Sequence, residues 1–131
     1  MKPNANVSLN NEDGNILITK SADNNNVTFA LNSTLSVGGL GKDGQPGKDG
    51  VIGAKGADGK TGVTLNGKDG SIGINGKDGS NGTITLAKGK PGVNGKDGED
   101  KTRITYQPVD EKGNPKGDPE HVATLNDGLN L

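Results

Sequence analysis

Aspartate followed by glycine is the residue pair of this sequence with the clearest potential for chemistry. The tetrapeptide Gly-Lys-Asp-Gly occurs five times, beginning at Gly41, Gly47, Gly67, Gly76 and Gly95. Carboxylates spaced between glycines are typical of nonapeptide repeats that bind calcium between parallel β-turns. Here glycine directly follows each of these aspartates, and a nine-residue period holds only from Gly67 to Gly76. We interpret the aspartates as turn residues with solvated carboxylates and expect no metal or cofactor; a calcium-dependent β-roll is an alternative.

Residues for nucleophilic or acid–base catalysis are scarce. The chain has one histidine, His121, and no cysteine. The carboxylate pairs Glu99-Asp100 and Asp110-Glu111 lie in polar segments typical of solvated turns. The run Gly59-Lys60-Thr61 is similar to the end of a phosphate-binding loop, but Ala54 stands where that loop needs its first glycine, and no helical pattern follows. The sequence therefore predicts no catalytic residues and no enzyme.

The composition is poor in apolar side chains for a chain that folds alone. Hydrophobic residues make up 27% of the 131 residues, against roughly 45–50% in an ordinary globular domain. Phe29 and Tyr106 are the only aromatic residues. The 24 glycines add to the entropic cost of ordering the backbone. We therefore expect the chain to share its core with copies of itself.

The charge pattern argues against two classes of partner. The 15 basic and 16 acidic residues are interspersed, and the formal net charge is −1. No basic patch indicates a nucleic-acid surface, and no basic amphipathic helix indicates a membrane surface. The first ten residues lack the apolar run of a signal peptide. We expect a segment of a longer protein that contacts neither nucleic acid nor membrane.

Glycine recurs at every third position from Gly38 to Gly62, which is the spacing of a collagen triple helix. Pro46 is the only proline within this run, and four other residues separate Gly62 from the next glycine, Gly67. A collagen helix needs about 15–20% proline or hydroxyproline. We therefore expect residues 38–62 to form an entry segment in which three chains run in close extended contact before they form sheets.

Short alternating and β-branched segments predict an all-β fold. Residues 6–35 have this character, and they contain a predicted hairpin with strands near 15–20 and 26–32. Three β-rich stretches follow at 62–67, 70–76 and 82–89. The Asp-Gly pairs between these stretches, Asp69-Gly70 and Asp78-Gly79, predict type I′ turns, in which both central residues have positive φ.

A last hairpin is predicted at the C-terminal end, where the alternating segment 102–109 returns as 121–125 across a polar loop. That loop, 108–120, and the glycine-rich turns are candidate contact surfaces because polar loops are exposed. Alternation also predicts inward or sheet-packing positions at Ile72, Ile74, Ile84, Leu86, Ile104 and Tyr106.

Residues 62–89 resemble the GIN domain of trimeric autotransporter adhesins. The Gly-Ile-Asn motif after which that domain is named stands here as Gly73, Ile74 and Asn75, among Gly-Lys-Asp-Gly repeats. Residues 103–131 resemble the end of such a domain and its exit into the next head module. Residues 14–40 resemble the last hairpin of a preceding Trp-ring-type head, although the chain has no tryptophan.

The resemblance implies an all-β, homotrimeric, intertwined, fibre-like head with short antiparallel strands and glycine-rich turns around a threefold axis. It implies that the GIN domain of each protomer consists of two small antiparallel sheets. The expected organisation is the end of a Trp-ring-like module over 1–37, a GIN-like domain over 38–125, and the start of a further module over 126–131. Gly73, Ile74 and Asn75 are structural motif residues, and the family supplies no ligand-binding residues.

The same resemblance implies a function in adhesion. The family lies on the surface of Gram-negative bacteria, anchored in the outer membrane through parts that this sequence does not contain. Its heads mediate attachment to host extracellular matrix or cells, autoaggregation and biofilm formation. The expected partners are two further copies of the chain and a host matrix protein or cell-surface receptor whose identity is open. The alternative is a purely structural trimeric fibre, such as a phage tail-fibre or collagen-like stalk segment.

Overall fold

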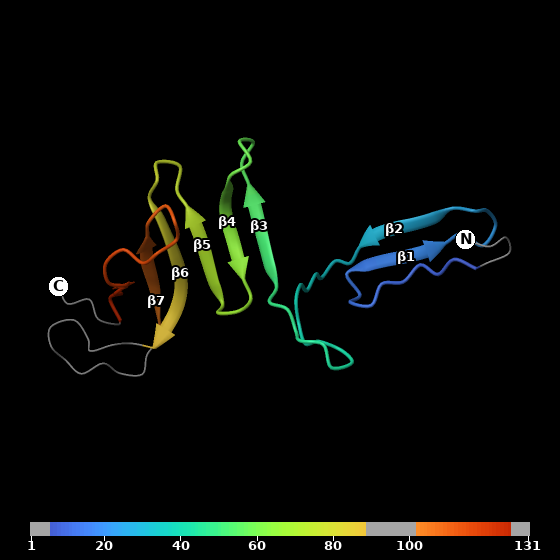
Figure 1. The fold of residues 1–131 in the computed structure, drawn as a ribbon, viewed down its shortest axis with the longest axis horizontal. Helices are drawn as coiled ribbons and strands as arrows, with labels where there is room; N and C mark the ends of the chain where they lie inside the picture. The colour runs from blue at the N-terminus through green and yellow to red at the C-terminus, as the bar shows by residue number, and fades with distance from the viewer. Residues whose placement is uncertain (1–5, 89–101, 127–131) are drawn as a thin grey trace. The chain divides into compact units, whose positions relative to one another are not determined.

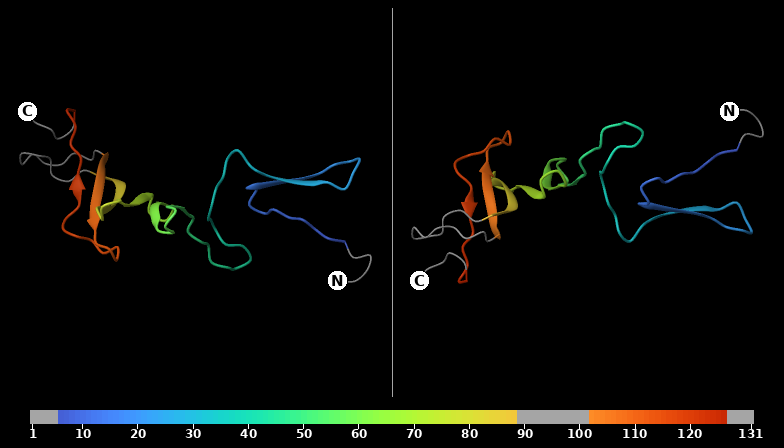
Figure 2. Two further views of the ribbon diagram at one scale, coloured as in Figure 1. Left: turned by 90° about the horizontal axis from the view of Figure 1, so that it is seen from above. Right: turned by 90° about the horizontal axis from the view of Figure 1, so that it is seen from below.

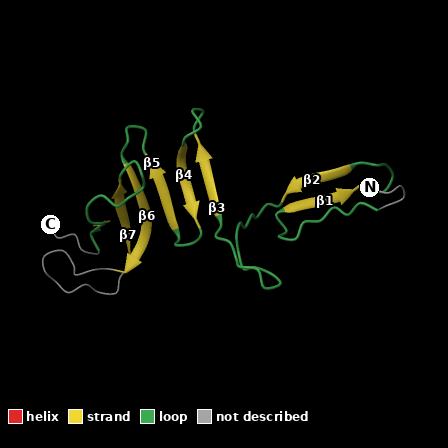
Figure 3. Cartoon of the chain, viewed as in Figure 1, coloured by secondary structure: helices red, strands yellow, loops and turns green. Residues whose placement is uncertain are grey.

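The computed structural model describes residues 6–88 and 102–126. Within these ranges every regular element is a strand, and all paired strands are antiparallel (Figures 1 and 3). The chain divides into two compact units, residues 1–37 and 38–131. The strands are β1 (Ile16–Lys20), β2 (Val27–Leu31), β3 (Val51–Lys55), β4 (Thr61–Asn66), β5 (Ser71–Asn75), β6 (Asn81–Lys88), β7 (Thr102–Val109) and β8 (Glu120–His121). The prediction of an all-β fold is confirmed.

The first unit is built on the predicted hairpin, which β1 and β2 form with Ile18 opposite Phe29. By contrast, the described residues before β1 contain no strand, so the expectation of β structure from residue 6 is wrong there. Asn15 closes the hairpin base instead, because its side-chain amide exchanges hydrogen bonds of 2.8 and 3.0 Å with the backbone of Ser36. The Asn15 side chain thus satisfies backbone groups of Ser36 that a further strand would otherwise pair with.

The second unit is a single six-stranded sheet in which each strand pairs with the next one along the chain, from β3 to β8. The longest ladder joins β6 to β7, from the pair Asn81–Val109 to the pair Lys88–Thr102. Figure 2 shows that the sheet is twisted, because β7 is seen along its length where the green strands β3 to β5 are seen nearly end on. The expectation of two small sheets for 38–125 is therefore wrong.

The C-terminal return strand is shorter than predicted. β8 pairs with β7 through two residues, with His121 opposite Thr105 and Glu120 opposite Tyr106. One further hydrogen bond of 2.9 Å joins the Val122 N–H to the carbonyl of Ile104. The predicted hairpin is present, but its second strand does not extend to residue 125.

Residues 38–62 do not form an extended entry segment. Gly39 and Lys48 exchange two backbone hydrogen bonds of 2.9 Å, which close a loop before the sheet begins. β3 and β4 then form a hairpin inside the same glycine series. The expectation of an extended chain before the sheets is wrong, because turns reverse the chain within the glycine run; contact among three chains there stays a prediction.

The sheet has one apolar and one polar face. Cross-strand partners share a face, and so do residues two apart along a strand. The register therefore places the six predicted packing positions on one face, together with Ile52, Ala54, Val63, Leu65 and Pro108. Ser71, Thr83, Thr85 and Thr105 occupy the opposite face. Yet no hydrophobic residue in the described part of the chain is buried.

The positive φ angles at the turns lead to a stability prediction. Gly79 has φ of 88° and open space where a Cβ would stand, so alanine there is strained by its backbone alone. We expect Gly79→Ala to lower the free energy of unfolding by about 1–2 kcal/mol. Gly53→Ala is the matched control, because Gly53 has no positive φ and ordinary contact distances for a Cβ.

Thermal unfolding of the two variants at one protein concentration measures the difference. Gly53→Ala should be neutral or raise stability by about 0.4–1 kcal/mol, since alanine restricts the unfolded chain. Equal destabilisation by both substitutions would contradict the assignment of strain to the turn.

Candidate functional site

The Gly-Ile-Asn motif forms the second half of β5. Ile74 lies on the apolar face between Val63 of β4 and Gly82 of β6. The Asn75 side-chain Nδ2 donates a 2.9 Å hydrogen bond to the Thr61 carbonyl and so connects β5 to the start of β4. A Cβ at Gly73 would make only ordinary contacts, the nearest at 3.8 Å. The motif is part of the sheet framework and brings no reactive groups together.

The apolar face is the largest feature of the second unit that could take part in binding. Its side chains stay open to solvent: Ile72 is 39% exposed, Ile104 50% and Leu86 65%. Tyr106 is 44% exposed. The residues predicted to point inward therefore share one face, but nothing in the described part of the same chain covers that face.

An open pocket of about 550 Å³ lies at one end of this face. Ile74, Ile84, Tyr106 and Pro108 supply its apolar lining. The remaining lining comes from the β5–β6 turn, and from Val109 and Lys116 at and beyond the end of β7. The turn contributes a carboxylate, a hydroxyl and an amide through Asp78, Ser80 and Asn81. The pocket thus has an apolar lining with polar groups supplied from two sides.

The aspartates of the short turns are engaged by the backbone. In the turn 56–60, the carboxylate of Asp58 accepts a 2.9 Å hydrogen bond from the Lys60 N–H. In the turn 76–80, Asp78 accepts one of 3.0 Å from the Ser80 N–H, which holds its pKa below the usual 3.8. These carboxylates cap turns.

Both turns share one backbone pattern. The N–H of the first residue donates to the carbonyl of the fifth, and the N–H of the fourth donates back to the carbonyl of the first. The fourth residues, Gly59 and Gly79, have φ of 82° and 88°. Three-residue hairpin loops with one left-handed residue have this form. The prediction of a type I′ turn is therefore wrong at Asp78-Gly79, and it is also wrong at Asp69-Gly70, where only the glycine has positive φ.

A type I′ turn does form at a third Asp-Gly pair, for which none was predicted. Asp43 and Gly44 have φ of 53° and 77°, and the Gln45 N–H donates to the Lys42 carbonyl at 2.9 Å. The same four letters, Gly-Lys-Asp-Gly, thus give different turns at 41–44 and 76–79. At 47–50 they lead into β3 with no positive φ at all. The repeat starting at Gly95 lies outside the described residues.

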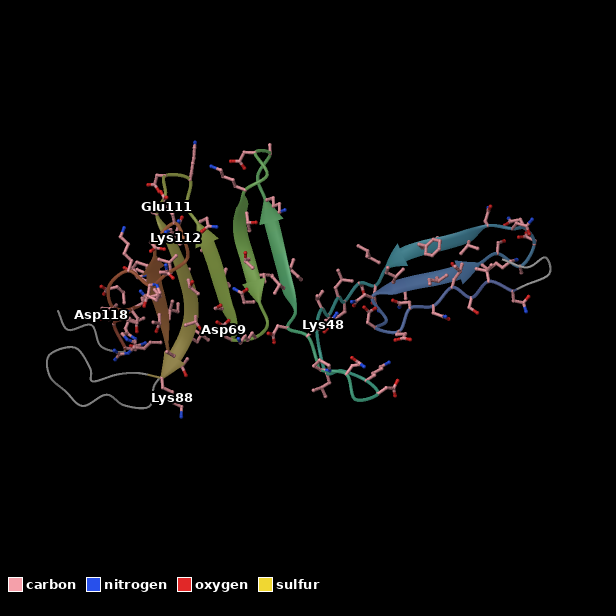
Figure 4. All side chains as sticks on the ribbon, in the orientation of Figure 1. Lys48, Asp69, Lys88, Glu111, Lys112 and Asp118 are labelled. Carbon is pink, nitrogen blue, oxygen red and sulfur yellow. The ribbon has the colours of Figure 1, made fainter. Side chains whose placement is uncertain are left out.

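The most connected polar group is at the β4–β5 turn, where Figure 4 labels Asp69. Ser71 is 5% exposed, and its hydroxyl donates a 2.6 Å hydrogen bond to the Asp69 carboxylate. The Ser71 N–H donates to the same oxygen at 3.1 Å, and Asn66 Nδ2 donates to the Ser71 hydroxyl at 3.3 Å. The Ser71 hydroxyl is the main reason that the pKa of Asp69 lies below 3.8. This network fixes the turn.

His121 is a strand residue, as predicted, and its cross-strand partner Thr105 places it on the polar face. Its Nδ1 lies 3.2 Å from the hydroxyl of Thr105, the cross-strand partner, which is 5% exposed. No carboxylate or thiol is hydrogen-bonded to this imidazole in the described residues. This side-chain contact pins β8 to β7.

One carboxylate, that of Asp110, joins several backbone groups of the polar loop after β7. Asp110 Oδ1 accepts hydrogen bonds of 2.9 Å from the N–H groups of both Lys112 and Asn114. The Asp110 N–H and the Asn114 carbonyl are also 2.9 Å apart. The side chains of Glu111 and Lys112 lie on this loop in Figure 4 and are exposed. Asp110 is thus a structural residue, whereas Glu111 is free to contact solvent or a partner.

Sequence reasoning missed the pocket and the turn network. Pro108 lies where the predicted strand meets the predicted polar loop, and Lys116 lies in that loop; their approach to the β5–β6 turn depends on the register of β6 with β7. The pairing of Asp69 with Ser71 had a local signal, since an aspartate often caps the residue two positions later in a turn. No group of three or more His, Cys, Asp or Glu residues in the described ranges is arranged to hold a metal.

Comparison with known proteins gives no relative for this chain. No family model matches the sequence, and neither a curated protein nor a solved structure matches it significantly. Across the ranges that the structure describes, no helix has the length and hydrophobicity needed to cross a membrane.

The Ser71–Asp69 pair leads to a prediction about pH. Because the folded pKa of Asp69 is lowered, its contribution to stability is present above about pH 4 and is lost as the pH falls through that lowered pKa. We expect Ser71→Ala to raise the pKa of Asp69 toward 3.8. The stability difference between the variant and the parent should narrow below about pH 4.

Carboxyl NMR titration measures this pKa directly. Asp78 serves as the internal control, because its pKa is lowered mainly by the backbone N–H of Ser80 and should not respond to Ser71→Ala. An unchanged Asp69 titration in the variant would show that the hydroxyl does not hold the carboxylate charged.

Proposed function

We propose that this chain is a segment of a homotrimeric bacterial surface adhesin of the trimeric autotransporter type. It contributes to attachment to host extracellular matrix or cells, to autoaggregation and to biofilm formation, and it performs no catalysis. On this proposal it is displayed at the cell surface, anchored in the outer membrane through other parts of the protein. Residues 38–125 act as a GIN-like head domain around Gly73, Ile74 and Asn75.

The uncovered apolar face of the six-stranded sheet carries this proposal. A sheet that exposes Ile, Leu, Val and Tyr on one face requires a covering layer, and the described part of the chain supplies none. Copies of the same chain supply it most simply, since each contributes an identical face to a shared centre. Three such sheets would enclose a core that one chain lacks.

The order of the strands supports a fibre-like assembly. The chain enters the sheet at β3 and crosses it one strand at a time to β8. A domain entered at one edge and left at the other extends its protein along the direction across the strands. This progression suits a head segment placed in series with others.

One test of this proposal measures the mass of the protein in solution. Light scattering coupled to size exclusion should give three times the 13.2 kDa mass of one chain. Leu65→Asp places a charge on the apolar face, where the native leucine is 47% exposed, and it should lower the mass toward that of one chain. Thr64→Asp, on the opposite face of the same strand, is the matched control. A folded monomer of the parent chain would overturn the proposal.

Another test distinguishes a role in adhesion from a role as a spacer. The trimer should bind at least one of immobilised fibronectin, collagen and laminin above an albumin control in surface plasmon resonance. Replacing the exposed loop residues Glu111, Lys112 and Asp118 with serine should leave the fold unchanged. A loss of matrix-protein binding in this variant would identify the loop as a contact surface. A trimer that binds no matrix protein or host cell, beside a neighbouring head module that does bind, would favour the purely structural fibre.

A further inference from the structure

We propose that the pocket at the end of the apolar face receives Leu86 and Ile104 of a neighbouring copy of this chain. The proposal rests on the homotrimer proposed above and names the contact that would close it. Each copy presents the knob, Leu86 with Ile104, at one end of β6 and β7. It presents the pocket around Ile84 and Tyr106 toward the other end of the same strands.

The knob is the more exposed part of these two strands. Leu86 and Ile104 are direct cross-strand partners, 65% and 50% exposed, and they form one apolar projection. Fully burying a leucine or isoleucine side chain stabilises a structure by about 1.5–3 kcal/mol relative to exposure. Neither residue lines the pocket of its own chain.

The floor of the pocket on the apolar face has the complementary composition, while polar groups of the β5–β6 turn and Lys116 form part of its lining. Its lining includes Ile74, Ile84, Tyr106 and Pro108, and its open volume of about 550 Å³ accommodates apolar side chains. Gly82 lies between Ile74 and Pro108 in the cross-strand register, so this part of the face carries no side chain and is hollow. The hollow and the knob therefore alternate along one pair of strands.

A rotation axis makes this contact repeatable. In a trimer with rotational symmetry, equivalent residues of the three copies lie at the same position along the axis. An axis perpendicular to the strands therefore places β6 and β7 of each copy beside β6 and β7 of the next. Knob and pocket lie on these same strands, and every two residues along a strand add about 7 Å to the distance between them. A contact between different patches of identical chains is heterologous, and it forms a closed ring when the rotation closes.

A cysteine cross-link tests the contact directly, because the native chain contains no cysteine. Leu86→Cys combined with Pro108→Cys should form covalent trimers with a short bismaleimide, seen on denaturing gels. Leu86→Cys alone should give none, because the two different patches meet. Leu86→Cys with Leu65→Cys is the matched control, since Leu65 is on the same face two strands away from β6 and outside the pocket.

Charge substitution gives an independent readout. Leu86→Asp should raise the concentration at which the trimer half-dissociates by at least about tenfold. Thr83→Asp, on the polar face of the same strand, should not. Circular dichroism confirms that each variant keeps its β signal, because Leu86 is already exposed in the single chain.

The outcomes distinguish this contact from the trimer itself. A trimer of the parent chain that gives no Leu86–Pro108 cross-link, or that cross-links equally through Leu65, overturns the knob and pocket and leaves the homotrimer standing. Cross-linking of the Leu86→Cys variant alone would show that position 86 of one copy lies beside position 86 of another, and it would also overturn the contact between knob and pocket. A monomeric parent chain overturns both proposals.

Discussion

The rest of this structure depends on an imbalance between the two faces of one sheet. Hydrogen bonds along the ladders satisfy the backbone from β3 to β8, and the polar face adds side-chain bonds such as Thr105 with His121. The other face carries many of the large apolar side chains of the second unit and leaves most of these in contact with water. The backbone ladders define the sheet, and within the described residues no buried apolar side chain adds to its stability.

Glycine spacing, which first suggests collagen, has several separate causes here. Gly59 provides a left-handed residue at a turn, and Gly62 is the extra residue where the register of β3 with β4 shifts. Gly76 begins a turn in which a Cβ would overlap the Ser80 carbonyl oxygen. Gly53 lies in a strand with room for a side chain. A regular period therefore does not require a regular structure, because short hairpins repeat at similar lengths.

Local pattern was sufficient for the hairpin β1–β2 and for the shared face of Ile72, Ile84 and Tyr106. Period-2 alternation depends only on neighbouring residues, so a single sequence reveals it. It was insufficient for β3, whose residues Val51–Lys55 include a central glycine and sit inside the triplet series. The pocket was beyond sequence reasoning, because it depends on the long-range pairing of β6 with β7. Turn type also escaped prediction, since identical tetrapeptides adopt the turn that the flanking strands permit.

The three-residue turns separate what the backbone needs from what the surface displays. The second position is held by Ala57 in one turn, Lys77 in another and Glu111 in a third. A neutral, a positive and a negative side chain thus occupy equivalent places above the same hydrogen-bond pattern. Mutation at these tips alters the chemical appearance of the molecule while the sheet beneath is unaffected. Such an arrangement lets the charge at the turn tips change while the hydrogen bonds that form the turns stay the same.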